Sequence, residues 1–77
     1  MSDKIMLGWT VTDIDSNEEL SGAPTSDLVQ ASVSAGDTGA VLAYADEDGD
    51  WHHVREDRAD DYRRMGYAVR TVYVTEA

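Results

Sequence analysis

Residues 40–55 read AVLAYADEDGDWHHVR, and this stretch decides the fold. The apolar run at 40–45 is typical of a strand buried in a sheet, and residues 51–55 alternate between the two faces of a second strand. Between these runs, Asp48 and Gly49 tolerate the positive φ angles of a tight turn. The stretch therefore predicts a β-hairpin with an acidic tip.

Strands are also predicted near both ends of the chain. Residues 5–14 alternate between the two faces of a strand, and residues 67–74 are rich in Val, Thr and Tyr, which favour extended structure. Residues 15–17 are turn formers. Residues 18–23 fit either a short return strand or a loop.

A first helix is predicted at about 25–35. Thr25 or Ser26 can serve as its N-cap, and Gly36 is a natural residue to end it. Its valines and serines have low helix propensity, so a loop is the alternative for this segment.

A second helix is predicted to begin at Asp57 and to end at Gly66. Its acidic residues come first and its arginines last, an order that suits the helix dipole. Ala59, Tyr62 and Met65 share one stripe of this helix. We therefore expect Tyr62 and Met65 to be core residues.

The predicted order of elements is β-α-β-β-α-β, in a single domain formed by residues 1–77. This order matches the split βαβ or ferredoxin-like pattern. That pattern is an α+β fold in which short helices cover one face of a four-stranded, mostly antiparallel sheet. A looser α+β sheet with only one helix is the alternative.

The chain carries a net charge of −10, from 16 Asp and Glu against 6 Lys and Arg. Because burying isolated charges is costly, most of the surface must be a negative field. Such a field repels nucleic acid and anionic membranes, and it attracts basic protein surfaces. We therefore expect a basic protein surface as the partner, with no direct binding to nucleic acid or to a membrane.

The chain has no cysteine, which excludes disulfide bonds and zinc thiolate sites and fits a reducing compartment. Residues 1–7 lack the apolar core of a signal peptide, and no apolar run approaches the length of a membrane span. These features predict a cytoplasmic protein.

The acidic hairpin tip has some features of a calcium loop but lacks others. Counting from Asp46, the places that need Gly and a bidentate Glu in an EF-hand hold Trp51 and Asp57. His52 and His53 are neighbours on a strand, so they point to opposite faces and cannot chelate one ion. We expect neither a metal nor a cofactor.

Catalysis is not expected either. The sequence contains no Ser-His-Asp arrangement, P-loop or dinucleotide-binding glycine motif. A two-layer domain of this size also has little room for the dry pocket that would tune a pair of carboxylates. We therefore predict a protein that is not an enzyme and has no catalytic residues.

The acidic residues gather near the first predicted turn, at the hairpin tip and at the start of the second helix. Their excess is larger than the net charge of about 2–8 that solubility asks of a small domain, which suggests a surface made for a basic partner. We expect the tip and the helix start to form one binding surface, to which Trp51, His52 and Tyr44 beside the tip bring residue types common at interfaces. Its candidate residues are Asp46, Glu47, Asp48, Asp50, Trp51, Glu56, Asp57, Asp60 and Asp61. The alternative is that both acidic groups are ordinary solvated ends of secondary structure, because helix starts attract acids.

Residues 66–73 read GYAVRTVY, and this segment resembles the C-terminal strand of many small bacteriophage proteins. Those strands often read Gly, aromatic, x, Val, x, Pro, Leu, Tyr, whereas this chain has Thr71 and Val72 in place of Pro and Leu. The whole chain resembles the tiny, acidic, cysteine-free phage proteins that include anti-CRISPR and anti-restriction inhibitors, some of which are DNA mimics.

The resemblance implies a viral, protein-binding inhibitor that occupies a basic nucleic-acid-binding surface of a host defence complex, in the cytoplasm of the host cell. The alternative is a non-enzymatic structural or regulatory module. In that case the acidity serves solubility or life in a high-salt host.

Overall fold

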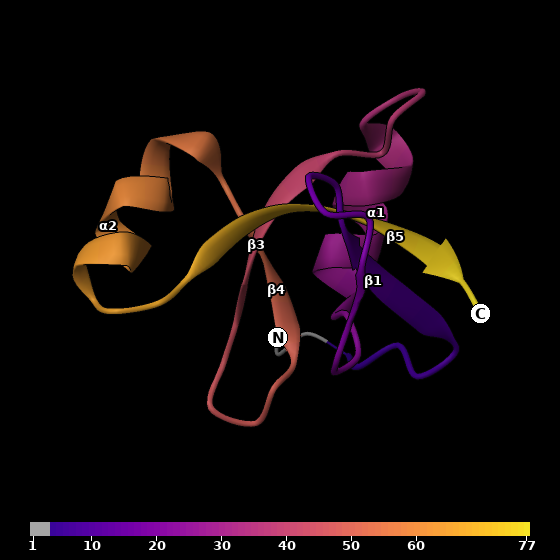
Figure 1. The fold of residues 1–77 in the computed structure, drawn as a ribbon, viewed down its shortest axis with the longest axis horizontal. Helices are drawn as coiled ribbons and strands as arrows, with labels where there is room; N and C mark the ends of the chain where they lie inside the picture. The colour runs from indigo at the N-terminus through magenta and orange to yellow at the C-terminus, as the bar shows by residue number, and fades with distance from the viewer. Residues whose placement is uncertain (1–3) are drawn as a thin grey trace.

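The computed structural model of the chain describes residues 4–77 (Figure 1). Its elements are β1 (Trp9–Asp13), β2 (Glu19–Leu20), α1 (Ser26–Ser34), β3 (Val41–Ala45), β4 (Trp51–Val54), the 3₁₀ turn η1 (Glu56–Arg58), α2 (Ala59–Arg64) and β5 (Val69–Glu76). The five strands form one sheet in the order β2-β1-β5-β3-β4. All neighbouring strands are antiparallel.

The α+β class and the central hairpin are confirmed. β3 and β4 pair from Ala45 opposite Trp51 to Leu42 opposite Val54. Gly49 in the tip has a φ of 88°, a conformation that glycine adopts without strain. The first helix, predicted at about 25–35, is also formed.

The predicted four-strand, ferredoxin-like order differs from the order observed. In the ferredoxin-like order, the second strand of the hairpin enters between the chain's first strand and the hairpin's own first strand. Here β4 lies at an edge and β5 takes that central place, while the short β2 adds a fifth strand at the other edge. Strand length explains the exchange, because the eight residues of β5 pair with β1 at five positions and with β3 at four, whereas β4 has only four residues.

α1 packs on one face of the sheet and closes the hydrophobic core. Thr25 caps the helix, because its hydroxyl accepts a hydrogen bond from the backbone N–H of Leu28. Leu28 is fully buried at the centre of this layer. The buried core consists of Val11, Leu28, Val29, Ala43, Trp51, Val72 and Val74.

Ser32, on the buried side of α1, completes the edge of β5 beyond the end of β3. β3 pairs with β5 only as far as Val72. The hydroxyl of Ser32 accepts a hydrogen bond from the N–H of Val74 at 3.1 Å and donates one to the carbonyl of Gly39 at 2.8 Å. A serine therefore lies in an apolar layer because it satisfies the buried N–H of Val74 and the part-buried carbonyl of Gly39.

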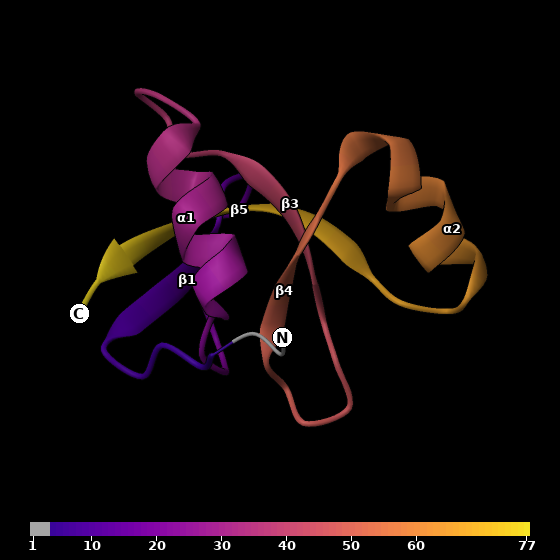
Figure 2. The same cartoon turned by 180° about the vertical axis from the view of Figure 1, so that it is seen from behind.

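α2 does not share the face of α1, as the ferredoxin-like pattern required. Ala43 belongs to the core beneath α1, so the next residue, Tyr44, points to the opposite face. There its ring stacks on Tyr62 of α2. Figures 1 and 2 show the two helices well apart along the sheet. Within residues 4–77, no helix has the length and apolar character needed to cross a bilayer.

The prediction that Tyr62 and Met65 are both core residues is wrong for Met65, which is 63% exposed. α2 spans only six residues and ends at Arg64, so Met65 lies beyond the turn that contacts the sheet. Tyr62 is half-buried among other rings. The first strand is also shorter than predicted, because β1 begins only at Trp9.

Candidate protein-binding surface

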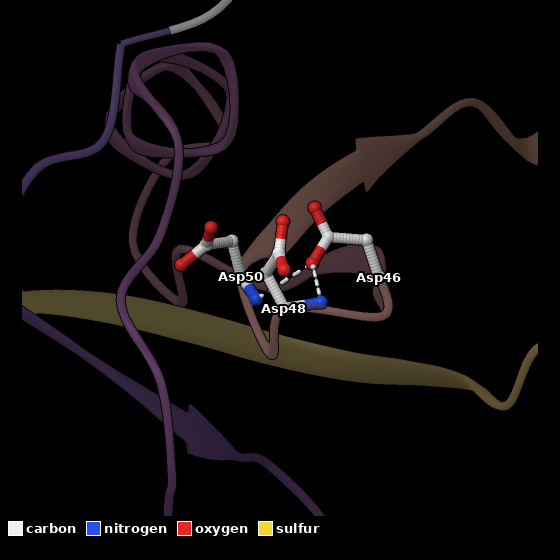
Figure 3. Close-up of side chains that lie close together, drawn as sticks. All are labelled: Asp46, Asp48 and Asp50. Carbon is white, nitrogen blue, oxygen red and sulfur yellow. Dashed lines mark hydrogen bonds between the residues drawn. The ribbon is translucent and has the colours of Figure 1, made fainter.

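The hairpin tip, residues 46–50, is built around the carboxylate of Asp46 (Figure 3). One oxygen of this carboxylate accepts hydrogen bonds from the backbone N–H of Asp48 at 2.9 Å and of Asp50 at 3.0 Å. The carbonyl of Asp46 accepts a further bond from the N–H of Gly49 at 3.0 Å. The side chain of Asp46 therefore shapes the turn and is not free to meet a partner.

The second oxygen of Asp46 lies 2.6 Å from Nε2 of His52, the side chain that follows the tip on β4. This hydrogen bond is the main reason that the pKa of Asp46 is below its usual value. The backbone N–H groups of Asp50 and Asp48 lower that pKa further. The tip is thus held to the sheet by a charged hydrogen bond as well as by its own turn.

A row of aromatic rings continues from His52 toward α2. The ring of His52 stacks on Tyr44 at a centroid distance of 5.2 Å, and Tyr44 stacks on Tyr62 at 4.5 Å. Tyr67 contacts Tyr44 at 4.8 Å with tilted rings. All four rings are half-buried, so part of the surface of each remains exposed.

Sequence reasoning did not find the contribution of Tyr62 and Tyr67 to this surface. The pairing of Tyr44 with His52 follows from the hairpin register, and could have been read from the turn position. The contact with α2 depends on how residues 55–68 return to the sheet, which no local pattern specifies.

The candidate residues at the tip differ in their access to solvent. Glu47 and Asp48 are exposed, and no side chain among residues 4–77 forms an ion pair with either of them. Asp50 is half-buried. Glu47 and Asp48 are therefore the carboxylates of the tip that are most available to a cationic partner.

Trp51, predicted to be part of this surface, is placed in the core. It is only 6% exposed, and its indole N–H donates a hydrogen bond to the carbonyl of Ser21 at 2.8 Å. The physical reason is the strand register, because Trp51 lies opposite Ala45 on the face that α1 covers. The half-buried rings on the opposite face are better placed to contact a partner.

The second helix follows the end of β4 that lies away from the tip (Figure 1), and three of the four acids there have arginine partners. Asp57 lies 3.3 Å from Arg55. Two pairs follow one turn further on, Asp60 with Arg63 at 3.1 Å and Asp61 with Arg64 at 3.7 Å. Glu56 is exposed and has no such partner among the described residues. The structure therefore separates the two predicted acidic groups and gives them different electrostatic surroundings.

The counts of charged residues show the same division along the chain. Residues 1–50 contain 11 Asp and Glu and a single Lys, so they carry the whole net charge of −10. Residues 51–77 contain five acidic residues and five arginines. The negative field therefore originates almost entirely in the first 50 residues.

One acid of the first 50 residues is neutralised from the other part of the chain. The carboxylate of Asp13 is 8% exposed and accepts a hydrogen bond from Arg70 at 2.9 Å. This bond, followed by those from the N–H groups of Asp15 and Ser16, holds the pKa of Asp13 below its usual value. Asp13 is thus a structural group at the end of β1.

The tip is also the place where carboxylates come close enough to share a cation. Oxygens of Asp46, Asp48 and Asp50 lie within 4.8 Å of one another. Asp46, however, already uses its oxygens for two backbone N–H groups and for His52. Calcium takes six to eight oxygen ligands, more than this group offers, so the expectation that no metal binds here stays a prediction.

No family model matches the chain, and no curated protein or solved structure matches it either.

Proposed function

We propose that this protein is an acidic inhibitor that binds a basic, nucleic-acid-binding surface of another protein, with the hairpin tip as its main contact. The observation that carries the proposal is the segregation of charge. Glu47 and Asp48 are exposed at the tip and have no cationic partner within residues 4–77, whereas the acids at 57, 60 and 61 are each paired with an arginine.

The chemistry of the tip suits such a partner. Arginine and lysine side chains that hold phosphates also form strong charge-assisted hydrogen bonds with carboxylates. The hydrogen bonds of Asp46 fix the turn before binding, which lowers the ordering cost of the contact. Beside the tip, His52 and Tyr44 offer partly exposed rings of the kind that anchor interfaces.

We propose further that the basic surface belongs to a host defence complex and that the protein is encoded by a phage. This part of the proposal rests on the resemblance to small acidic phage inhibitors. It places the contact in the host cytoplasm and assigns the protein no catalytic step.

A different observation favours a second function. Exposed carboxylates also lie away from the tip, at Glu18 and Asp37 in two loops and at Glu19 in the short edge strand β2. Acidity spread over several loops suits a structural or regulatory module that stays hydrated and soluble in a high-salt host. This function requires no contact at the tip.

The test is capture of the partner from a host-cell lysate on the immobilised protein, followed by competition with duplex DNA. Capture is compared between two double variants. One is Glu47→Lys with Asp48→Lys at the tip, and the other is Asp60→Lys with Asp61→Lys on α2. Each reversal changes the charge by two, so both variants have the same net charge of −6. Circular dichroism checks that both variants are folded.

We expect duplex DNA to release the captured complex, and the tip variant alone to lose most of the capture. The association rate of the wild-type protein should fall about tenfold between low and high salt, because the field steers the encounter. Loss of capture by both variants would support the single shared surface predicted from the sequence. Capture that survives the tip reversal, or an association rate independent of salt, would contradict the inhibitor and leave the solubility function.

A further inference from the structure

β4 is the last strand of the sheet, so one of its edges has no neighbouring strand in the described part of the chain, residues 4–77. In an antiparallel pair, the N–H and C=O groups of successive residues point alternately toward the partner strand and away from it. In β4 the backbone groups of Trp51 and His53 point away from β3. The N–H of Trp51 donates to the carbonyl of Ala23, and its carbonyl accepts from the N–H of Thr25, both at 2.9 Å. Residues 23–25 therefore cover the edge at Trp51, and their coverage stops where the chain turns into α1.

Beyond that point the edge is open, from His53 to Arg55. Among residues 4–77, no group forms a hydrogen bond with the N–H or C=O of His53 or with the N–H of Arg55. The carbonyl of Arg55 accepts the N–H of Arg58, which begins η1. Three outward backbone groups thus remain at the spacing that an added extended strand would match.

A groove borders the same three residues. Its volume is about 560 Å³, and His53, Val54 and Arg55 form part of its lining together with Val41 and Leu42 of β3. An extended peptide paired with His53 would direct every second side chain to one face of the sheet. Apolar side chains at alternate positions of the peptide would therefore find apolar contacts in this groove.

The charges around the edge indicate which peptide fits. Glu56 and Asp57 line the groove, and the carboxylate of Asp27 lies 4.0 Å from Nδ1 of His53. The cation in the lining is Arg55, and it is already paired with Asp57. A second copy of the chain would bring another net charge of −10 to this edge, whereas a peptide with Lys or Arg would relieve the negative field.

We propose that the outer edge of β4 binds an extended segment of a partner protein, with alternating apolar and basic residues, as an added β-strand. The contact uses the backbone of His53 and Arg55 and the groove beside them. It goes beyond the function proposed for the hairpin tip, because it uses a different surface and does not require the tip to bind.

The probe is a six-residue peptide of alternating valine and arginine with blocked ends, titrated into the ¹⁵N-labelled protein. Its controls are two peptides of the same sequence, N-methylated on the valines in one and on the arginines in the other. They keep the side chains and charges, and each lacks the amide donors of one peptide edge. One of these two peptides lacks the amide donors that would face β4, and it should bind at least about tenfold more weakly than the unmodified peptide, because main-chain hydrogen bonds supply the affinity of an added strand. The other should bind as the unmodified peptide does.

The unmodified peptide should shift the amide signals of His53 and Arg55 and slow their hydrogen exchange at least about tenfold. In the protein, His53→Pro removes an outward N–H at an edge position where proline is tolerated, so it should abolish this protection. His53→Ala keeps the N–H and should retain the protection. The tip variant Glu47→Lys with Asp48→Lys should also retain it, which separates this site from the tip contact.

Three results would overturn the proposal. One is equal binding by all three peptides, since this would show that charge alone attracts them. Another is a set of shifts centred on residues 46–50 instead of 53–55. The last is protection of the His53 amide from hydrogen exchange in the absence of peptide. If this protection grew with protein concentration, it would assign the edge to a second copy of the chain.

Discussion

Residues 1–50 and residues 51–77 build the same sheet but differ in charge and in packing. The first part carries the whole net charge of −10 and contributes α1, which packs on the sheet through the fully buried Leu28. The second part has as many arginines as acids and contributes α2, whose only buried residue is Ala59. The core contributed by α1 and the negative field are thus both properties of the first part, while α2 adds a neutral and mostly exposed helix.

The comparison also shows what the arginine pairs do. Exposed ion pairs such as Asp60 with Arg63 stabilise a fold by only about 0.2–1 kcal/mol each. Their larger effect is to cancel the local charge of α2. The helix is attached to the sheet by apolar contact, in which the ring of Tyr62 stacks on Tyr44 of β3.

The largest expected effect is on the α1 side. Leu28→Ala should lower the free energy of unfolding by about 3 kcal/mol, because it leaves a cavity in a fully buried site. Val33→Ala, on the same helix at an exposed position, is the matched control and should change stability by less than about 0.5 kcal/mol. Urea denaturation measures both. Equal stability of the two variants would show that α1 does not close the core.

A smaller effect is expected on the α2 side. Tyr62→Ala should cost about 1–2 kcal/mol, less than Leu28→Ala, because the ring is half-buried and its loss can be filled by water. Tyr62→Phe keeps the stacked ring and should be nearly neutral, and Met65→Ala should have no measurable effect. If Tyr62→Ala proved as destabilising as Leu28→Ala, the contrast between the two helices would fail.

The smallest expected change in stability concerns the tip and appears only in acid. The pKa of Asp46 is lowered in the fold, mainly by His52. Its hydrogen bonds therefore add stability above the unfolded carboxyl pKa of about 3.9, and this stability is lost as the pH falls through the lower, folded value. Asp46→Asn should flatten the acid side of the stability curve between about pH 5 and pH 2, measured by urea midpoints.

Two features make that measurement specific. Asp13 also has a lowered pKa, through Arg70, so part of the acid dependence should remain in Asp46→Asn. Asp48→Asn removes an exposed carboxylate whose side chain accepts no hydrogen bond within residues 4–77, and it should leave the curve unchanged. If the free energy of unfolding of Asp46→Asn fell in acid as steeply as that of the wild-type protein, the carboxylate of Asp46 would have no structural role.

Local patterns in the sequence were sufficient for the hairpin and for α1. The Asp48-Gly49 pair and the flanking alternation specify the turn, and Thr25 specifies the helix start by capping it. The order of the strands was not predictable in this way, because the central place of β5 depends on competition between distant segments for the core. The length of α2 was overestimated. The helix was predicted from Asp57 to Gly66, whereas residues 56–58 form the 3₁₀ turn η1 and α2 ends at Arg64.

The candidate site was predictable only in part. The acidic tip was found from composition, but composition cannot distinguish carboxylates that are exposed from those that are paired or that shape a turn, such as Asp46. Trp51 was assigned to the surface by its position beside the acids. Its shared face with Ala45 and Ala43 in the hairpin register explains why it is buried instead.

The central claim, that the negative field is strong at the tip and cancelled on α2, can be measured without a partner. Cationic and anionic nitroxide cosolutes enhance the relaxation of amide protons according to the local electrostatic potential. At low salt, where screening is weak, the ratio of cationic to anionic enhancement should be clearly larger at Glu47 and Asp48 than at Asp60 and Asp61. Equal ratios at the two ends of β4, or a larger ratio on α2, would contradict the account.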